Sequence, residues 1–346
     1  MNLALIGLGM VAATHIRAIS AASPTVKLRG VHARDVKKAE DFVEQMGSDI
    51  PEGTMIYASV DDIANDPLID FAIVTTPPNA RTAIVKKLVD AGKHILLEKP
   101  IERDRMAALE IVEMCEAANV ALGIVFQHRA REVSLKLSEL IKEEAFGAIK
   151  LVEISVPWWR NQAYYDEPGR GTYERDGGGV LISQAIHTMD LALTFTGPVR
   201  KVQAMAKTSA FHDMESEDFV SGGLEFASGA IGSLVASTAS YPGGAESIIL
   251  HCKKASVRLQ SGKLDINWQD GRNEVFGEDT ASGGGADPMA FTHAWHQGVI
   301  EDFAVAIKNN RPPMATGRQA LMVHDLIDAL VLSSREERAV LLSDLE

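Results

Sequence analysis

The chain has 346 residues, a length that predicts two domains at roughly 150 residues per domain. Apolar residues make up 46% of it and charged residues 23%, a composition that is typical of globular proteins and excludes global disorder. Its 47 Asp and Glu residues outnumber its 34 Lys and Arg residues, and the resulting net charge of −13 repels phosphate backbones, so we expect no nucleic acid partner.

The cysteines and the first apolar run indicate the compartment. Cys115 and Cys252 can form at most one disulfide, which predicts a protein of the reducing cytoplasm. The apolar run from Leu3 to Ala13 is shorter than the roughly 20 residues that cross a bilayer, so we expect no membrane association. No Lys or Arg precedes this run, which argues against a signal peptide.

The first third of the chain alternates short apolar runs with helical patterns, which is typical of an α/β fold with a doubly wound parallel sheet. Strands are predicted at residues 2–6, 26–33, 71–75, 94–97 and 120–126. Helices are predicted at residues 11–20, 35–46, 79–91 and 106–119. We expect Asp35 to cap the start of the second helix and Gly92 to end the third.

From about residue 149 the pattern changes to longer strands joined by turn signals, which predicts a large, mostly antiparallel, open-faced sheet. Strands are predicted at residues 149–158, 199–207, 219–226, 230–237, 247–252, 256–260 and 264–268. Helices are predicted at residues 181–195, 290–308 and 318–333. The glycine-rich segment 277–287 is expected to be mobile and is a candidate lid.

A glycine motif, Gly7-Leu8-Gly9-Met10-Val11-Ala12, follows the first predicted strand and opens the first predicted helix. In that context the pattern predicts the dinucleotide-binding turn of a Rossmann domain, with Gly7 for the tight turn, Gly9 for close approach of a pyrophosphate and Ala12 for helix packing. The alternative is a tight turn without a ligand. We therefore predict a dinucleotide-binding Rossmann domain at residues 1–121 and a substrate-binding and oligomerisation α+β domain at residues 122–346.

The end of the second predicted strand bears on the choice between NAD and NADP. NAD-specific sites normally place Asp or Glu there, and this sequence has Ala33. Arg34 follows and is suited to pair with a 2′-phosphate, so the sequence favours NADP over NAD. The alternative is a solvated arginine, or one that stacks on adenine and serves both cofactors.

Two further motifs lie where other strands of the parallel sheet are predicted to end. Thr75-Thr76-Pro77-Pro78-Asn79 falls at the sheet edge where ligands of open α/β sheets bind, although an ordinary helix start explains the same residues. Glu98-Lys99-Pro100 follows the next strand. A lysine at that point faces the crevice and is a candidate catalytic group, whereas most lysines are structural.

These motifs resemble those of the glucose-fructose oxidoreductase, inositol dehydrogenase and rhizopine catabolism family, written Gfo/Idh/MocA. The resemblance covers essentially the whole chain and extends to Gln127-His128-Arg129, Gly177-Gly178-Gly179, Ile186-His187-Thr188-Met189-Asp190 and Ile300-Glu301-Asp302-Phe303. It implies transfer of hydride between NAD(P) and a hydroxyl or keto carbon of a sugar, sugar derivative or cyclitol, by a homodimer or homotetramer. The cofactor site implied, beyond the glycine motif and Ala33-Arg34, is Thr75, Thr76, Pro77, Asn79, Glu98, Lys99 and Gln127.

The resemblance also implies the catalytic groups, with Lys99 holding the reacting hydroxyl and His187 acting as acid or base. The chemistry supports these residue types independently, because a histidine of ordinary pKa near 6.5 can accept a proton and a lysine cation stabilises a developing alkoxide. In the inositol dehydrogenase branch an acid precedes this histidine by four residues. Here that residue is Ser183, so the sequence departs from that branch. Asp190 lies one helical turn after His187.

The remaining predicted substrate contacts lie around an aromatic segment. They are Arg129, Trp159, Arg160, Tyr164, Thr172, Ser183, Gln184 and Asp190, together with Lys99 and His187. Aromatic faces suit a carbohydrate ring, and the alternative is an aromatic cluster that packs one domain on the other. His293 and His296 have a helical spacing that permits metal chelation, but no third ligand is evident, so we expect no metal site.

Two other functions are compatible with the same motifs. One is a non-catalytic dinucleotide sensor, against which the presence of both Lys99 and His187 argues. The other is a glycoside hydrolase that oxidises and re-reduces its substrate with tightly held NAD, which would show no net cofactor reduction.

Overall fold

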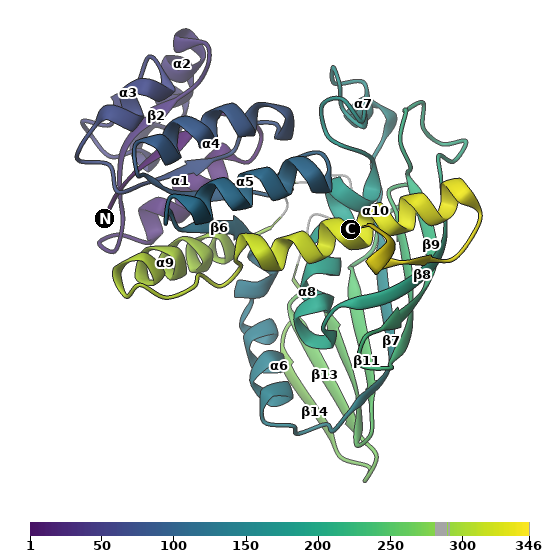
Figure 1. The fold of residues 1–346 in the computed structure, drawn as a ribbon. Coiled ribbons are helices and arrows are strands. Elements are labelled where there is room, and N and C mark those ends of the chain that lie inside the picture. Colours follow the sequence, from purple (N-terminus) through teal and green to yellow (C-terminus); the bar gives the residue numbers. More distant parts are fainter. Residues whose placement is uncertain (281–288, 290, 346) are drawn as a thin grey trace. The chain divides into compact units, whose positions relative to one another are not determined.

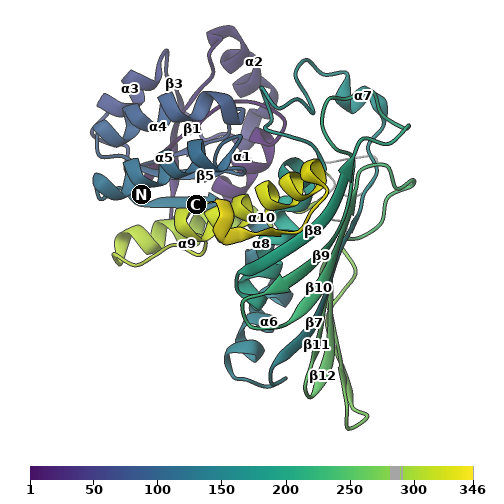
Figure 2. The ribbon, with the colours of Figure 1, turned by 45° about the vertical axis from the view of Figure 1, so that its right-hand side comes forward.

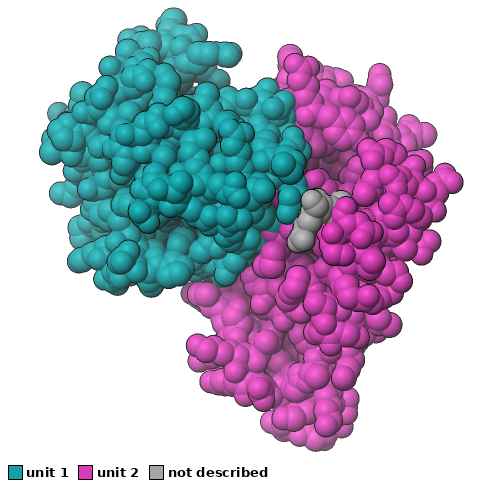
Figure 3. All heavy atoms as spheres, in the orientation of Figure 1, with its two compact units in different colours: residues 1–130, 292–321 teal, residues 131–291, 322–346 magenta. Residues whose placement is uncertain are grey.

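The computed structural model describes residues 1–280, 289 and 291–345, and its internal contacts divide the chain into two units. Unit 1 contains Met1–Ala130 and Thr292–Leu321, and unit 2 contains Arg131–Phe291 and Met322–Glu346 (Figure 3). The candidate lid at residues 277–287 lies outside the described residues from residue 281 onward, so it stays a prediction.

Unit 1 is built on a parallel sheet of six strands in the order β3-β2-β1-β4-β5-β6 (Figure 1). The strands are β1 (Asn2–Ile6), β2 (Lys27–His32), β3 (Met55–Ile56), β4 (Phe71–Val74), β5 (His94–Glu98) and β6 (Leu122–Val125). The doubly wound parallel sheet is thus confirmed, and only the two-residue strand β3 was not predicted. Strand β6, which begins at the predicted domain boundary, pairs with β5 and so belongs to this sheet.

The predicted helices of unit 1 are present, with starts one to four residues from the predicted ones. The helices of this unit are α1 (Ala12–Ala21), α2 (Val36–Met46), α3 (Val60–Asn65), α4 (Arg81–Asp90), α5 (Arg105–Ala117) and α9 (Ala294–Lys308), with 3-10 turns at Gly47–Asp49, Pro78–Ala80 and Gln127–Ala130. The short helix α3 was not predicted. Asp35 accepts the backbone N–H of Lys37 at 3.0 Å and so caps α2, as predicted. Gly92 ends α4 with φ +68°.

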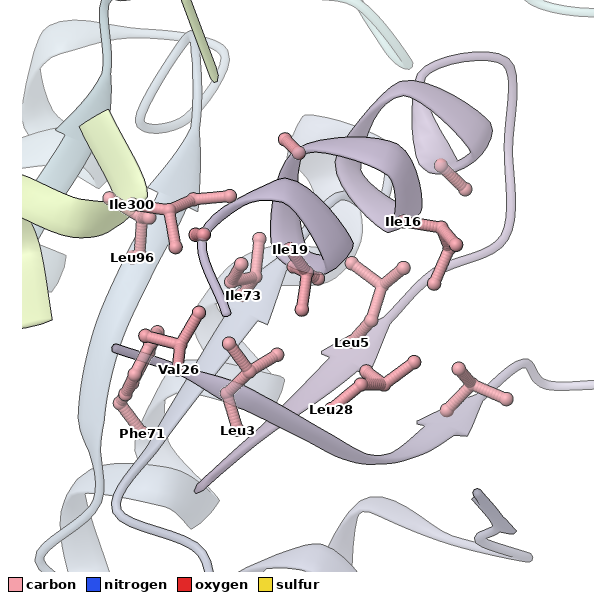
Figure 4. Packing of buried hydrophobic residues seen from close by; sticks show 14 of the residues in the cluster. Leu3, Leu5, Ile16, Ile19, Val26, Leu28, Phe71, Ile73, Leu96 and Ile300 are labelled. Carbon is pink, nitrogen blue, oxygen red and sulfur yellow. The ribbon is translucent and has the colours of Figure 1, made fainter. Parts of the chain in front are cut away.

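Helix α9 packs into unit 1 although it lies about 170 residues after β6 in the chain, and this long return was not predicted. Its residue Ile300 joins Leu3 and Leu5 of β1 and Ile19 of α1 in one buried cluster (Figure 4). Phe303, also from α9, is fully buried, and a β-carbon on Gly123 of β6 would lie 2.6 Å from its ring. Gly123 therefore makes room for the aromatic ring over the sheet.

Unit 2 is built on a sheet of nine strands in the order β14-β13-β12-β11-β7-β10-β9-β8-β15. The strands are β7 (Ile149–Pro157), β8 (Val199–Lys207), β9 (Phe219–Phe226), β10 (Ile231–Ser237), β11 (Ser247–Cys252), β12 (Ala255–Gln260), β13 (Lys263–Trp268), β14 (Asn273–Gly277) and β15 (Val340–Leu341). The mostly antiparallel sheet is confirmed, with one parallel pair, β10 with β7. Strands β14 and β15 were not predicted.

Helices α6 and α8 of unit 2 lie against one face of this sheet, as Figures 1 and 2 show. The helices of this unit are α6 (Glu132–Lys142), α7 (Gln162–Tyr165), α8 (Ile186–Thr196) and the part of α10 (Gly317–Glu336) that follows residue 321, with a 3-10 turn at Leu342–Leu345. The helix predicted at residues 181–195 is present, but its first five residues, Leu181–Ala185, form a π turn before α8 begins. Among the described residues, no helix is long and apolar enough to span a membrane.

The packing of α9 generates a stability prediction. Phe303→Ala removes a fully buried ring that meets Phe71 edge to face at 5.4 Å, and we expect it to lower the free energy of unfolding of unit 1 by about 3–5 kcal/mol. Unfolding in urea, monitored by hydrogen exchange of the β4 and β5 amides, measures this change in the free energy of unfolding. Val305→Ala is the matched control on the same helix, since Val305 is 38% exposed. Equal midpoints for the two variants would contradict the assignment of α9 to this core.

Candidate functional site

The glycine motif forms the turn between β1 and α1. Gly7 has φ +102°, and a β-carbon on it would lie 2.9 Å from the backbone nitrogen of Thr76. A β-carbon on Gly9 would meet no described atom within 4 Å, so the turn is open at this residue. Leu8 is buried and Met10 is 49% exposed, while Val11 forms the N-cap of α1. The turn therefore combines a tightly packed first glycine with an accessible second one, as a pyrophosphate needs.

The residues after β4 are bonded directly to this turn. Thr75 donates its hydroxyl to the carbonyl oxygen of Gly7 at 2.6 Å, and its backbone N–H donates to the carbonyl of Ile6 at 2.8 Å. Pro77 and Asn79 follow and are exposed, Asn79 within the 3-10 turn Pro78–Ala80. The structure thus brings together the two motifs predicted for the cofactor at one edge of the parallel sheet.

The end of β2 has no acidic residue. Ala33 follows the strand directly and is buried, and Arg34 is exposed. His32, the last residue of β2, is fixed by a bond of 2.9 Å between its Nδ1 and the carbonyl oxygen of Tyr57. Arg34 forms no hydrogen bond or ion pair with another residue in the part of the chain that the structure describes.

A buried arginine, Arg81, joins the turn after β4 to the turn after β5. Its Nε and Nη2 donate to the carbonyl oxygen of Thr76 at 3.0 and 2.8 Å, and its Nη1 donates to the carbonyl oxygens of Glu98 and Pro100. Burial lowers the pKa of Arg81 to about 10, opposed by the charge of Glu98. Because the guanidinium stays charged at neutral pH, it holds the backbone on both sides of Lys99 in one arrangement.

The side chain of Glu98 lies under Lys99 in a buried cluster. Its Oε1 is 2.8 Å from Nε2 of His15 and 3.8 Å from Nε2 of His296, and its Oε2 accepts the backbone N–H of Lys99 at 3.1 Å. Burial raises the pKa of Glu98, but the hydrogen bond with His15 and the charges of His15, His296 and Lys99, in that order, outweigh it and hold the pKa at about 2. Lys99 itself is half-buried.

His15 and Arg81 were not among the predicted site residues, and His296 was considered only as a partner of His293. The structure pairs His296 with Glu98 and His15 instead, with a distance of 5.0 Å between the two imidazole centres. A buried polar residue on the apolar face of a predicted helix is the signal that points to His15 and Arg81.

The segment after β6 also packs within unit 1. Gln127 and Arg129 are buried in the 3-10 turn Gln127–Ala130. Arg129 donates from Nη1 to the carbonyl oxygen of Met314 and to Oε1 of Gln319, both at 2.9 Å. The guanidinium that was predicted to contact substrate therefore also anchors the segment before α10.

In unit 2, Glu217 bonds the backbone just before the helix that carries His187. Glu217 was not among the predicted site residues. The Glu217 carboxylate accepts the N–H groups of Gly179 at 3.2 Å and Leu181 at 3.1 Å, and its backbone carbonyl accepts the N–H of Val180 at 2.8 Å. Burial raises the pKa of Glu217, while these N–H groups act in the opposite direction. A β-carbon on Gly179 would lie 1.8 Å from the Glu217 carbonyl oxygen, which explains the last glycine of the triplet.

The π turn at Leu181–Ala185 changes how the predicted substrate residues are presented. Ser183 is half-buried in the π turn, and its N–H donates to the carbonyl of Gly179 at 3.0 Å. Gln184, in the same turn, is buried, as are His187 and Asp190 in α8. Single π turns inside helices are frequent at functional sites.

Two arginines and a tyrosine come together near this helix in unit 2. The guanidinium of Arg170 lies 4.7 Å from the ring centre of Tyr164, and that of Arg160 lies 5.7 Å from the same ring. Gln184 donates from Nε2 to the Tyr164 hydroxyl at 3.3 Å. Thr172 lies in the following turn, where its hydroxyl donates to the carbonyl oxygen of Gly169 at 2.8 Å.

Trp159 and Arg160 are fixed from below by a buried histidine that was also not predicted. His212 contacts the carboxylate of Asp218 through Nδ1 at 2.7 Å and the carbonyl oxygen of Arg160 through Nε2 at 2.8 Å. Trp159 meets Phe211 and Tyr241 edge to face, at 6.1 and 5.4 Å between ring centres. The aromatic segment is therefore held by packing within unit 2.

Comparison with known proteins agrees with this architecture. Residues 1–126 match the model of an oxidoreductase family with an NAD-binding Rossmann fold, and residues 134–258 match the GFO/IDH/MocA C-terminal domain. The chain is 30% identical to the WlbA dehydrogenase from Chromobacterium violaceum, crystallised with NADH and UDP-GlcNAcA. That alignment covers 99% of this chain and 95% of WlbA with a TM-score of 0.82. This chain belongs to the Gfo/Idh/MocA family.

Other relatives of this chain align with it over different fractions of their length. An uncharacterized oxidoreductase of Schizosaccharomyces pombe is 27% identical over 48% of this chain, and the chain spans only 45% of that protein. The scyllo-inositol 2-dehydrogenase (NADP(+)) IolW of Bacillus subtilis is 21% identical over 86% of each chain. The family membership thus extends over both units.

The contact between Gly179 and Glu217 generates a prediction for this family member. Gly179→Ala forces a β-carbon against the Glu217 backbone, so we expect it to destabilise unit 2 by about 3 kcal/mol or more and to disorder the start of the His187 helix. Hydrogen exchange of the amides at residues 180–190 measures the second effect.

Gly223→Ala is the control, because a β-carbon on Gly223 would meet no described atom within 4 Å. Similar exchange rates in the two variants would show that Glu217 does not determine where the His187 helix begins.

Proposed function

We propose that the protein is an NAD(P)-dependent oxidoreductase that acts on a CH–OH group of a sugar, sugar derivative or cyclitol. The observation that carries the proposal is the arrangement in unit 1: Lys99 follows β5 at the sheet edge that also holds the open turn at Gly9. Arg81 ties this lysine turn to Thr76, whose turn packs against Gly7. A ligand that reaches both turns needs a pyrophosphate at one end and a reacting group at the other.

The dinucleotide site proposed consists of the predicted residues in the turns after β1, β2, β4 and β5. The fit rests on the accessible backbone at Gly9 and on the start of α1, whose N–H groups favour an anion. A bound nicotinamide supplies the acceptor or donor of hydride. Gln127, buried after β6, is proposed to complete the nicotinamide end of the site.

Two side chains are proposed to handle the proton of the reacting hydroxyl. Lys99 as an ammonium hydrogen-bonds the hydroxyl and stabilises the alkoxide that develops as hydride leaves the carbon. His187 accepts the hydroxyl proton in oxidation and returns it in reduction. Asp190, on the same helix, is proposed to help orient the site.

The substrate class is supported by the aromatic and cationic side chains of unit 2. The guanidinium groups of Arg160 and Arg170 both lie near the Tyr164 ring, and Trp159, next to Arg160 in the chain, adds an indole. Aromatic faces suit the C–H face of a sugar ring, and guanidinium groups suit hydroxyl or carboxylate oxygens. We propose that Arg129, Trp159, Arg160, Tyr164, Thr172, Ser183 and Gln184 include the substrate contacts.

We also propose that the protein forms a homodimer or homotetramer and that it is cytoplasmic. Met205, Ile231 and Val235 are 49%, 58% and 42% exposed, and the register of β8, β9 and β10 places them on one face of the unit 2 sheet. A homodimer or homotetramer would cover such a face. Free, buried Cys115 and Cys252 are consistent with a cytoplasmic protein.

The catalytic proposal predicts the effect of two substitutions. Lys99→Ala and His187→Ala should each lower kcat by about 100-fold or more, because each removes a positioned proton or charge donor. Dinucleotide affinity, measured by fluorescence titration, should remain for His187→Ala. Lys136→Ala, which removes an exposed lysine of α6, serves as the control. Wild-type turnover in either site variant would contradict its assigned role.

The cofactor preference generates a separate prediction. Arg34→Ala should weaken NADP binding about tenfold or more and leave NAD binding nearly unchanged, since a charge-assisted bond to phosphate contributes about 1.5–3 kcal/mol. Ala33→Asp should shift the preference toward NAD by repelling the 2′-phosphate. Isothermal titration of both dinucleotides tests this. If the wild type prefers NAD and Arg34→Ala weakens both equally, Arg34 stacks on adenine instead.

A further inference from the structure

Three buried side chains from three elements meet beneath Lys99. His15 comes from α1, Glu98 from the end of β5 and His296 from α9, and their exposed fractions are 0%, 6% and 1%. All three belong to unit 1, so their contacts are part of one packed core. A buried carboxylate in such a place is costly unless hydrogen bonds and charges compensate for lost hydration.

The hydrogen-bond geometry assigns the proton of His15. Its Nε2 lies 2.8 Å from Glu98 Oε1, while its buried Nδ1 has no hydrogen-bond partner among the described residues. A buried N–H without an acceptor is costlier than a buried lone pair without a donor, so the proton sits on Nε2 and is donated to Glu98. His15 therefore serves as a hydrogen-bond donor to a charged Glu98.

The other groups around Glu98 determine the balance of charge. Arg81 from α4 bonds the Glu98 backbone, and its charge interacts with Glu98 and with Glu102, which follows β5. His296 is neutral above about pH 3, because burial lowers its pKa to about 3. His293, the N-cap residue of α9, adds a further interaction with His296. At neutral pH the charges of Arg81 and Lys99 both interact favourably with the Glu98 carboxylate.

The interaction between Glu98 and Lys99 acts in both directions. The Lys99 charge favours the ionised form of Glu98, and by linkage the ionised Glu98 favours the protonated form of Lys99 by the same free energy. The backbone adds a direct connection, since the Lys99 N–H donates to Glu98 Oε2. The buried Glu98 carboxylate therefore bonds the Lys99 backbone and also favours the charged form of the Lys99 side chain.

We infer that His15, Glu98 and His296 form a positioning cluster for Lys99, in which the buried Glu98 carboxylate holds the lysine as an ammonium ion beneath the reacting hydroxyl. His15 keeps this carboxylate ionised by donating a hydrogen bond, and His296 closes the cluster on its other side. The inference rests on the proposed function only for its catalytic consequence, because the protonation of Lys99 is measurable without substrate.

The same three side chains also have the composition of a metal site, and the geometry argues against one. Their ligand atoms lie within 4.8 Å of one another. A metal on Nε2 of His15 would leave an N–H at Nδ1, where the described residues provide no acceptor, whereas metal-bound histidines almost always donate that proton. The charges of Lys99 and Arg81 near Glu98 further oppose a cation.

The first test follows the ionisation of Lys99 in the intact protein. Lysines are converted to their 13C-dimethyl derivatives, which keep the charge, and the Lys99 signal is identified by its loss in Lys99→Arg. Glu98→Gln should lower the pKa of Lys99 by about 1 or more, because an isosteric neutral group replaces a nearby buried charge. Asp66→Asn is the matched control: Asp66 in unit 1 also carries a lowered pKa, about 2, but through Tyr57 and Arg29. If Glu98→Gln is too unstable to study, Glu98→Asp should give a smaller shift in the same direction.

The second test concerns His15 and uses stability against pH. The pKa of Glu98 is about 2 in the folded protein against an ordinary 4.5, so its stabilising contribution is present above pH 4.5 and is lost as the pH falls toward 2. His15→Phe keeps a ring but removes the donor, so the pKa of Glu98 in the folded protein should rise toward 4.5. The stability lost below pH 4.5 should therefore be smaller in this variant, and the loss should be complete at a higher pH. In the Glu98→Gln background, His15→Phe should leave the acid dependence unchanged.

The outcomes separate this inference from the proposed function. A Lys99 pKa that is equal in Glu98→Gln and wild type would overturn the inference, whatever the enzyme activity. A tightly bound metal ion that is lost in His15→Phe would overturn it as well. If no sugar or cyclitol is oxidised but the Lys99 pKa shifts as expected, the proposed function fails and the positioning cluster stands. With an active wild type, the alkaline limb of kcat/KM should move with the lysine, which a merely structural Glu98 would not cause.

Discussion

The candidate site of unit 1 depends on one buried cation. The guanidinium of Arg81 donates to carbonyl oxygens of Thr76, Glu98 and Pro100, and so joins the turns that follow β4 and β5. Backbone carbonyls at the ends of strands have no partner in the sheet, and in the interior they need donors. One planar group with several fixed N–H bonds supplies them, which a lysine could not do. The Thr75 hydroxyl in turn donates to the carbonyl oxygen of Gly7. Hydrogen bonds therefore connect the turns that follow β1, β4 and β5.

Unit 2 achieves a similar result with a carboxylate in place of a cation. Glu217 accepts N–H groups at the start of the segment that leads to His187, and the absence of a side chain at Gly179 lets the two backbones touch. A negative group at a helix start is favourable, and burial strengthens the interaction. In both units, therefore, a charged residue that is buried and bonded to backbone fixes the element that carries a proposed catalytic side chain.

The sequence was sufficient for the parallel sheet because buried strands such as Phe71–Val74 are continuous apolar runs between glycine, proline and helix signals. It was insufficient where structure depends on partners far along the chain. The return of α9 to unit 1 rests on the fit of Phe303 over Gly123, which no local pattern encodes. The π turn before α8 escaped prediction because a single extra residue leaves the apolar periodicity of a helix nearly intact.

The parts of the candidate site that lie in recognisable sequence motifs could be predicted from the sequence. The glycine turn, the Thr75 turn and Lys99 were placed correctly at one sheet edge, since carboxyl ends of parallel strands meet there. The residues that hold them were not, because Arg81 and His15 occupy helices where a polar side chain is expected to face solvent. Their burial is visible only once the helices are packed.

The measurement that tests the central claim most directly is the fate of the hydrogen on the carbon that reacts. A panel of sugars, sugar acids and cyclitols deuterated on the ring carbons is incubated with the protein and each oxidised dinucleotide, and the nicotinamide is analysed by mass spectrometry. Our account predicts deuterium in the reduced nicotinamide at one equivalent per product, with loss of the transfer in Lys99→Ala. Deuterium that returns to a hydrolysed sugar without net cofactor reduction, or that never leaves any substrate, would contradict it.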